Sequence, residues 1–296
     1  MKSTVCLTLI SHGVGAFLIL SCLMFLLLLI RCGDVEINPG PLISNISLWS
    51  SNVRGLNSDM IDCILADVAC KYDILGICET FLNITSDIEL TIPGYLPIFR
   101  KDRLGHGGGV ALYVADSCSA KRLDIFESPN FESLWVEVKS QTSIMAVCVC
   151  YRSQTEGDPF WEHLQESVES VKMAGYSNLI LLGDFNSDPG NRPVWNKFNY
   201  FCQTVSLKYH INEATRITLT SATILDQVLT SDNIEPNNIV VYPPLGRSDH
   251  YQLSINIHLI KVHRSSAYKR LIWQYDKADW DGLNHALSNN DWIPIM

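Results

Sequence analysis

Short apolar runs that end in a polar residue constrain this chain more than any other feature of its sequence. Residues 74–78 are followed by Glu79, and residues 179–183 are followed by Asp184 and then, after Phe185, by Asn186. Apolar runs of about four to eight residues, bounded by polar turns, are typical of buried β-strands. The pattern predicts a sheet-rich chain that gathers carboxylates and amides at the ends of its strands.

Further polar residues extend this set. Asn52 follows the segment 48–51, Asp226 lies within the expected strand 223–230, and Asp249 and His250 precede the alternating strand 251–259. Oxygen ligands from Asp, Glu and Asn suit Mg²⁺, which prefers an octahedron of oxygens and keeps several waters. A cation held there can activate a water and neutralise charge on a phosphate. We therefore expect Mg²⁺-dependent hydrolysis of phosphoesters, with Mn²⁺ as a substitute.

The spacing of apolar residues predicts a mixed α/β fold. Helical spacing occurs in 59–71 (Met60, Ile61, Ile64, Leu65 and Val68) and after Pro159 (Trp161, Leu164, Val168 and Val171). Strands are expected near 47–53, 74–79, 95–100, 110–115, 133–138, 144–151, 178–183, 223–230 and 251–259. This order favours two packed sheets flanked by helices. The glycine-rich segment 105–109 lacks the Gly-Lys-Ser/Thr of a phosphate-cradling loop, so we expect a tight hairpin there.

Five segments carry a resemblance to a known family. They are 48–56 (LWSSNVRGL), 74–80 (ILGICET), 179–186 (LILLGDFN), 223–229 (TILDQVL) and 246–251 (GRSDHY). In this order and spacing they resemble the endonuclease/exonuclease/phosphatase superfamily, and more closely the apurinic-type endonuclease domain of non-LTR (LINE-type) retrotransposons. The resemblance covers about residues 45–260 and implies a DNase I-like sandwich of two mixed sheets flanked by helices. It also implies nicking of target DNA, which leaves a 3′-hydroxyl to prime reverse transcription of the element's RNA.

The resemblance assigns roles to individual residues. It implies that Glu79 binds the metal with support from Asn52, and that Asp184 and Asn186 orient and deprotonate the attacking water. His250, oriented by Asp226, would stabilise the transition state. Asp249 would be a second-shell or second-metal ligand, and Tyr151 would approach the phosphate. The family often places proline after this tyrosine, whereas Arg152, Ser153 and Gln154 follow it here.

Charge and cysteine content limit the other classes of function. The net charge is −9 and the pI is about 5.3, so no global basic field attracts nucleic acid. DNA binding would depend on local cations near the catalytic loops, for which Arg54, Arg152 and Arg247 are the candidates. The ten cysteines contain no Cys-x-x-Cys pair, which favours a reduced, intracellular domain with core thiols such as Cys148 and Cys150.

The N-terminal residues 1–41 form a separate region. Residues 13–30 form an apolar, uncharged run. The run is just long enough to be a membrane anchor, and it also fits the apolar part of a signal sequence. Directly afterwards, 34–41 resembles the 2A-type ribosome-skipping peptide at every fixed position: Asp34, Glu36, Asn38, Pro39, Gly40 and Pro41. Skipping would begin a nuclear or cytoplasmic product at Pro41, whereas the unskipped product would follow a membrane or secretory route.

Residues 261–296 resemble the linker that joins endonuclease to reverse transcriptase in these elements, and no polymerase motif follows. We therefore expect a truncated copy or fragment, with element RNA as a partner only through the missing enzyme. Two alternatives stay open: a phosphatase or RNA nuclease of the same fold, and a membrane-anchored or secreted binding protein that has lost catalysis. The intact set of catalytic positions argues against the second.

Overall fold

The computed structural model describes residues 45–259, except 84, 87–89, 104, 141 and 142, together with residues 280, 282, 285 and 288. The chain divides into one unit of residues 1–260 and another of residues 261–296. The expected N-terminal hydrophobic helix and the 2A-type peptide lie outside the described residues. Among the described residues, no helix is long and apolar enough to cross a membrane.

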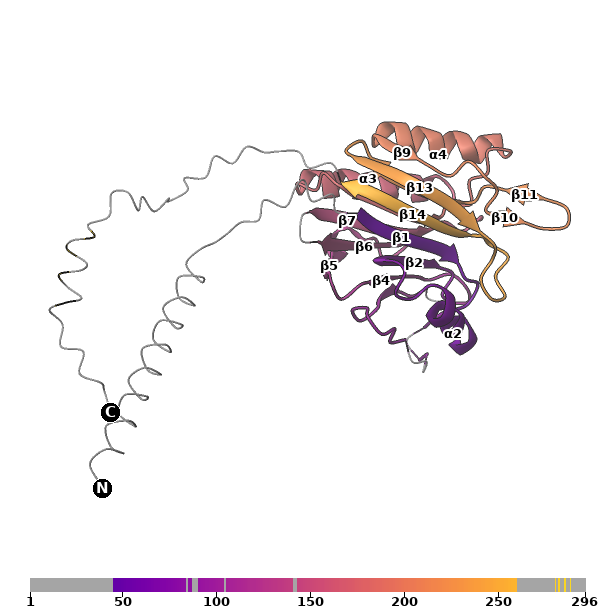
Figure 1. Ribbon diagram of the computed structural model, residues 1–296. Helices are drawn as coiled ribbons and strands as arrows, with labels where there is room; N and C mark the ends of the chain where they lie inside the picture. Colours follow the sequence, from indigo (N-terminus) through magenta and orange to yellow (C-terminus); the bar gives the residue numbers. More distant parts are fainter. Residues whose placement is uncertain are drawn as a thin grey trace, which may run out of the picture. The chain divides into compact units, whose positions relative to one another are not determined.

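Two six-stranded sheets form the centre of the first unit (Figure 1). The first sheet contains, in order, β13 (Ile234–Tyr242), β14 (Gln252–Leu259), β1 (Asn45–Asn52), β2 (Ile74–Cys78), β4 (Val110–Val114) and β3 (Phe99–Lys101). The second contains β5 (Ser119–Arg122), β6 (Glu132–Lys139), β7 (Ile144–Tyr151), β8 (Leu179–Asp184), β12 (Asp226–Ser231) and β9 (Leu207–Tyr209). Strands β1 and β2 are parallel, as are β7 and β8, while the other neighbours are antiparallel. Both sheets are therefore mixed.

Helices cover the outer faces of the two sheets. Helix α2 (Ser58–Asp67) packs its buried side chains into an apolar cluster with the first sheet. Helices α3 (Asp158–Met173) and α4 (Arg192–Thr204) do the same on the second sheet, beside the short helix η1 (Asp124–Phe126). A further cluster fills the space between the sheets. These clusters make the predicted sandwich of two mixed sheets flanked by helices, which is confirmed.

Strand β7 shows how the sequence produces these layers. Met145, Val147 and Val149 belong to the cluster between the sheets, whereas Cys148 and Cys150 belong to the cluster under α3 and α4. Side chains alternate between the two faces of a strand. Because both faces of β7 are covered, almost every residue is apolar, and its pattern is a continuous run rather than an alternation.

Several expected elements differ in the structure. Helix α2 starts after its cap Asn57, whose Oδ1 accepts the Met60 N–H, and it ends at Asp67 rather than Lys71. Cys70 takes a left-handed φ of 64°, which is incompatible with a continuing helix. Leu65, expected on the apolar face, is 39% exposed. The expected strand 223–230 is interrupted, since β11 (Ala222–Thr223) ends before β12 begins at Asp226.

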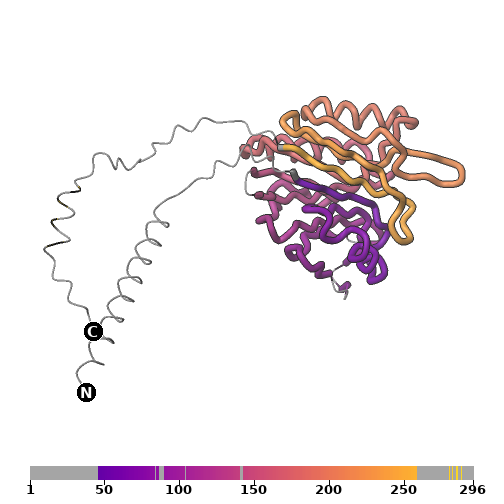
Figure 2. Tube along the Cα trace, viewed as in Figure 1, coloured from indigo at the N-terminus to yellow at the C-terminus, as the bar shows by residue number. Residues whose placement is uncertain are grey.

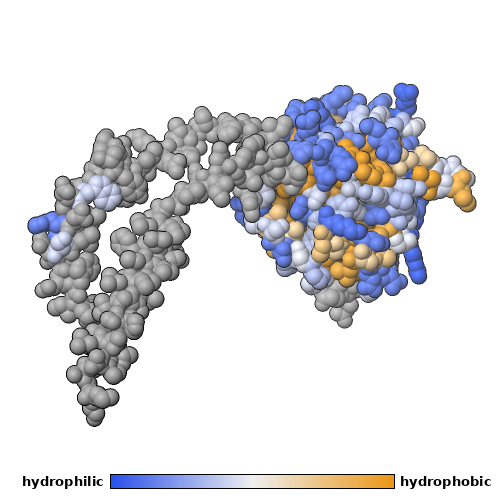
Figure 3. Space-filling model, viewed as in Figure 1, coloured by the Kyte–Doolittle hydropathy of each residue, from blue (hydrophilic) through white to orange (hydrophobic). Residues whose placement is uncertain are grey.

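Two hairpins complete the description of the fold. Strands β3 and β4 form the expected hairpin, but residues 102–109 join them in a wider loop than a tight turn. Strands β10 (Arg216–Ile217) and β11 form a small separate hairpin that projects from the domain (Figure 2). Leu219 lies between these strands and is fully exposed, and the projecting part in Figure 3 carries hydrophobic surface beside weakly hydrophilic surface.

Candidate active site

The ends of neighbouring strands bring the predicted catalytic residues together. Asn52 ends β1 and Glu79 directly follows the parallel strand β2, so both lie at the same edge of the first sheet. Asp184 ends β8 in the second sheet, and Asp226 pairs with it from the antiparallel strand β12. His250 stands just before β14. All five residues therefore lie at or next to strand ends, and Asp226 is the first residue of its strand rather than an interior one.

Asn52 joins acids from the two sheets. Its Nδ2 donates to Glu79 Oε1 at 3.0 Å and to Asp184 Oδ2 at 3.0 Å, while its Oδ1 accepts the Arg54 N–H at 3.1 Å. Asn52 is fully buried. The amide therefore holds two candidate ligands at a fixed separation, whereas its own oxygen, predicted as a metal ligand, faces a backbone amide.

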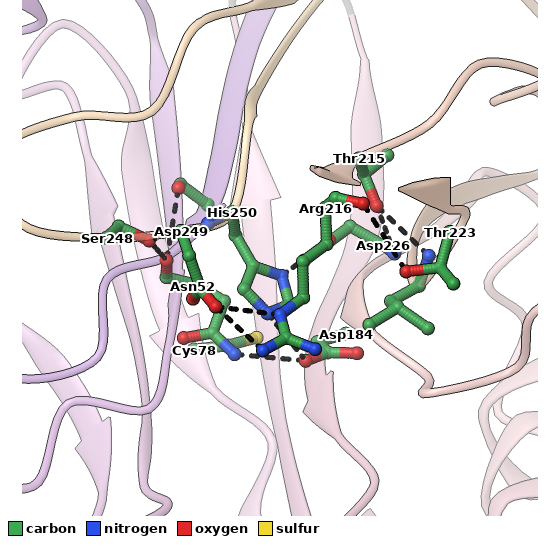
Figure 4. A network of polar contacts seen from close by, with 12 residues as sticks. Asn52, Cys78, Asp184, Thr215, Arg216, Thr223, Asp226, Ser248, Asp249 and His250 are labelled. Atoms are coloured by element: carbon green, nitrogen blue, oxygen red, sulfur yellow. Dashed lines mark hydrogen bonds and ion pairs between the residues drawn. The ribbon is translucent and has the colours of Figure 1, made fainter. Parts of the chain in front are cut away.

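Asp226 and His250 form the predicted pair. Asp226 Oδ2 lies 2.8 Å from His250 Nδ1, and His250 Nε2 lies 4.0 Å from Asp184 Oδ2. Thr215, which is also buried, accepts the Asp226 N–H with its Oγ1 at 3.0 Å and so fixes the start of β12. The imidazole is thus held by its Nδ1, with its Nε2 directed toward the acids of the site (Figure 4).

Burial and charge shift the ionisation of this group. Burial, together with the charge of Asp226, raises the pKa of Asp184 to about 7, although His250, Asn52 and the Asn186 N–H act against that rise. Burial opposes a charge on His250, but the neighbouring carboxylates, first Asp226 and then Asp184, raise its pKa to about 9. The site is therefore an accumulation of buried acids that is only partly neutralised by one imidazole.

The donor set fits a divalent cation. Asp184, Asp226 and His250 offer ligand atoms that lie within 4.8 Å of one another. Among the described residues, Asp226 Oδ1 is buried and has no hydrogen-bond partner. Imidazole suits zinc and other transition metals, whereas carboxylate oxygens suit Mg²⁺. Glu79 and Asp184, which are joined through Asn52, and the unpartnered Asp226 Oδ1 are therefore the groups that could hold a divalent cation.

Asp249 has different partners from those expected of a metal ligand. Arg216 Nε and Nη2 both lie 2.8 Å from its Oδ2, and Arg54 Nη1 lies 3.1 Å from its Oδ1. Burial alone would raise the pKa of Asp249, but Arg216 and then Arg54 hold it below its usual range. Asp249 is therefore ion-paired with two guanidinium groups, and its predicted role as a second-shell or second-metal ligand stays a prediction.

Arg152 also differs from its predicted role. It is 3% exposed, and its Nε and Nη2 donate to the carbonyls of Phe185 and Asn186 at 2.7 and 2.8 Å. Its guanidinium also lies 5.5 Å from the ring centroid of Trp161. A cation buried in this way is not available to DNA phosphates. Arg152 instead supports the loop that carries Asn186, while Arg54 and Arg247 are exposed as predicted.

Asn186 and Tyr151 flank the acids. Asn186 Nδ2 donates to the Arg152 carbonyl at 2.7 Å, and its Oδ1 accepts from Gln154 at 3.2 Å. The residues that replace the family's proline therefore hold this amide. Burial and then the charge of Glu79 raise the pKa of Tyr151, which stays protonated and can donate a hydrogen bond.

The backbone is unusual at the same positions. Glu79, Asn186 and Arg54 have left-handed φ values of 53°, 46° and 49°. Such values are uncommon for residues other than glycine, and they concentrate at functional sites where the surroundings enforce them. The strain marks the same strand ends that the sequence pattern selects.

Three residues of the network were not among the sequence candidates: Thr215, Arg216 and Ser248. Ser248 Oγ donates to the Asn52 carbonyl at 2.5 Å and accepts the His250 N–H at 3.0 Å. It ties the loop before β14 to the end of β1. Ser248 was present in the quoted 246–251 segment, but sequence alone gave no reason to separate its role from those of its neighbours.

Comparison with known proteins agrees with this geometry. A model of the endonuclease/exonuclease/phosphatase family matches residues 49–250. The chain belongs to this family. This family of phosphodiesterases, nucleases and phosphatases shares the fold, and a buried cluster of two acids and a histidine lies within the matched residues.

Solved structures of the same fold have diverse activities. The endonuclease domain of TRAS1, a telomere-specific non-LTR retrotransposon, is 16% identical with a TM-score of 0.59, over 73% of this chain and 99% of that one. NExo from Neisseria, a 3′ phosphatase bound to a product DNA hairpin, is 17% identical with a TM-score of 0.52, over 71% and 98%. ANGEL2, a 2′,3′-cyclic phosphatase, is 14% identical with a TM-score of 0.53, over 73% and 96%. At these identities the likeness concerns the fold.

Proposed function

We propose that this protein is a Mg²⁺-dependent endonuclease that nicks DNA, as in target-primed reverse transcription of a retroelement. The observation that carries the proposal is the joining of Glu79 and Asp184 by one buried amide, with the Asp226–His250 pair 4.0 Å from Asp184. This arrangement combines a cation site, a proton acceptor and a proton donor on one edge of the sandwich. Phosphodiester hydrolysis needs all three.

The residues divide the chemistry among themselves. A divalent cation held by Glu79 and Asp184 would supply charge neutralisation and a water of lowered pKa. In the metal-free site the pKa of Asp184 is raised to about 7, and a cation beside it would favour the ionised carboxylate, which can accept a proton from water. His250 is charged, and because Asp226 engages its Nδ1, its Nε2 can donate to a phosphate oxygen. Tyr151 can donate a second hydrogen bond to the phosphate.

DNA is the proposed substrate despite the acidic chain. Arg54 and Arg216 bring two positive charges to Asp249, which leaves one in excess beside the site, and Arg247 is exposed on the adjoining loop. The TRAS1 domain belongs to a retrotransposon endonuclease and NExo was solved with a DNA hairpin. Both similarities support a nucleic acid substrate, and the first supports the retroelement role.

Nicking of supercoiled plasmid tests the proposal. The purified full-length chain should convert it to open circles with Mg²⁺ or Mn²⁺ but not with EDTA. Glu79→Gln should remove most of the activity, while Glu169→Gln, an exposed change on α3, should leave it intact. An unchanged rate in EDTA would refute the metal requirement. Release of phosphate from 3′-phosphorylated DNA, or cleavage of RNA alone, would assign the chain to another branch of the family.

We further propose that residues 34–41 direct ribosome skipping, so that a nuclear or cytoplasmic product begins at Pro41. The support is the match of every fixed position from Asp34 to Pro41. Residues 1–60 placed between two reporters in a cell-free lysate should give two separate products, and Pro41→Ala should give one fused product. A single fused product from the unaltered segment would leave the anchor or signal role for residues 13–30.

A further inference from the structure

The glycine-rich loop of residues 105–109 lies against the candidate site, yet the proposed chemistry makes no use of it. The Gly109 and Gly108 carbonyls accept the N–H groups of Thr80 and Phe81 at 3.2 and 2.9 Å. These two residues directly follow Glu79. The loop backbone therefore holds the segment that sets the direction of the Glu79 side chain.

An ion pair holds the loop in turn. Arg103 Nε and Nη2 donate to the two carboxylate oxygens of Glu132 at 2.8 and 2.9 Å. Glu132 Oε1 also accepts the Gly109 N–H at 2.8 Å, and Glu132 is 6% exposed. Bidentate pairs of this kind fix orientation as well as distance. Glu132 is the first residue of β6, and it thus ties the loop to that strand.

The same ion pair reaches Tyr151 from the other side. The Arg103 guanidinium carbon lies 5.4 Å from the centroid of the Tyr151 ring, within the range of a cation–π contact. Glu132 stands directly opposite Tyr151 in the pairing of β6 with β7. Tyr151 in turn stands opposite Asp184 in the pairing of β7 with β8. Arg103 therefore lies against a ring at the strand ends that carry the candidate metal ligands.

The glycines are required by this packing. Gly108 has a φ of +69°, and a Cβ on it would lie 2.4 Å from Glu132 Oε1 and 2.6 Å from Arg103 Nε. Gly109 has a φ of +87°, and a Cβ there would lie 2.4 Å from Thr80 Oγ1. A side chain at Gly108 would therefore displace the ion pair, and one at Gly109 would displace Thr80. Gly107 has a φ of +75° but would make only an ordinary contact, with Phe81 at 3.7 Å.

We propose that Arg103 and Glu132 are positioning residues that fix Glu79 and Tyr151 for the cation and the phosphate. This inference rests on the proposed metal-dependent hydrolysis. Arg103 does not serve as a free cation for DNA, because its guanidinium is neutralised and geometrically occupied by Glu132. It acts through the loop on one side and through the Tyr151 ring on the other.

The test compares two ion pairs in the full-length chain. Arg103→Lys keeps the charge but loses the planar fork, and Glu132→Gln keeps the shape but loses the charge. Arg122→Lys is the matched control, because Arg122 makes an equivalent bidentate pair with Glu127 at 3.0 and 2.8 Å and, among the described residues, contacts none of the candidate site residues. Mn²⁺ affinity, measured by electron paramagnetic resonance, reports the site without catalysis. Two further measurements are made on the same variants: hydrogen exchange at the backbone amides of Thr80 and Phe81, and plasmid nicking.

Changes in residues that orient metal ligands cost about 10- to 100-fold in affinity or activity, so Arg103→Lys and Glu132→Gln should weaken Mn²⁺ binding about tenfold or more. Exchange at Thr80 and Phe81 should become faster, while Arg122→Lys should change neither. Mn²⁺ affinity equal to that of the control variant, or no Mn²⁺ binding by the unaltered chain, would overturn the inference. A chain that binds Mn²⁺, loses affinity on Arg103→Lys and yet nicks no DNA would support it while refuting the proposed function.

Discussion

His250 and Asp226 act as one unit at the scale of single residues, since the carboxylate fixes the imidazole through its Nδ1 at 2.8 Å. We expect His250→Ala and Asp226→Ala each to lower kcat by about 10²- to 10⁴-fold, the range for acid–base and electrostatic groups. The double variant should be little worse than either single one. Single-turnover nicking of all three variants measures this, and fully additive losses would show that the two residues act separately.

The raised pKa of His250 also predicts how stability depends on pH. A group that gains protons on folding stabilises the protein fully below its ordinary pKa of 6.5, and that stabilisation is lost as pH rises through about 9. The thermal unfolding midpoint of the metal-free protein should therefore fall as the pH rises from 6.5 to about 9. Asp226→Asn should flatten this decline because it removes the largest charge that raises the pKa. An equally steep decline in Asp226→Asn would contradict the assignment.

The exposed and buried arginines should respond differently to substitution. Each phosphate neutralised on duplex DNA contributes about 0.9 to the slope of log affinity against log salt. Arg54→Ala or Arg247→Ala should therefore reduce the slope by about 0.9 each. Arg152→Ala should leave the slope unchanged and lower stability, because it removes the donor to the Asn186 carbonyl and one of the two donors to the Phe185 carbonyl. Binding titrations at several salt concentrations distinguish the two kinds of arginine.

At the scale of elements, the end of β8 depends on Gly183. Its φ is +138°, and a Cβ would lie 2.0 Å from the Cys150 carbonyl oxygen in β7. Gly183→Ala should therefore cost about 1–3 kcal/mol more than the conformational term alone, as expected for overpacking. Gly175→Ala is the matched control, since its φ is +96° and nothing lies within 4 Å of the added atom. Urea unfolding compares the variants, and equal losses would refute the steric argument.

At the scale of the whole molecule, the site joins two sheets through their acids. Burial and the charge of Asp226 raise the pKa of Asp184 to about 7, so the metal-free fold loses stability as pH rises from 3.8 toward that value. A bound cation should reverse this loss and stabilise the fold by an amount that grows with the logarithm of its concentration above Kd. We expect Mg²⁺ to raise the thermal unfolding midpoint at pH 8, and EDTA to return the midpoint to its metal-free value. The rise should disappear in Asp184→Asn, and its persistence there would place the cation elsewhere.

The sequence by itself determined the layers and the location of the site. Continuous apolar runs such as those of β2 and β8 require cover on both faces, so they specify a sandwich without reference to distant residues. Acids that follow such runs must lie where the strands of a sheet end. The sequence did not predict helix α4, because Asn and aromatic residues of weak helix propensity occupy much of it. Its stability comes from the burial of Phe198 and Phe201.

Only the tertiary structure decided what each polar group contacts. Asn52 donates to acids of both sheets, Asp249 is held by Arg54 and Arg216, and Arg152 is buried against Trp161. These partners are far apart in the sequence, and their pairing depends on how two sheets and their loops pack. Residue type and spacing fix which element a side chain belongs to, but hydrogen bonds act over about 3 Å. The direction of each donor is therefore set by packing that no local pattern contains.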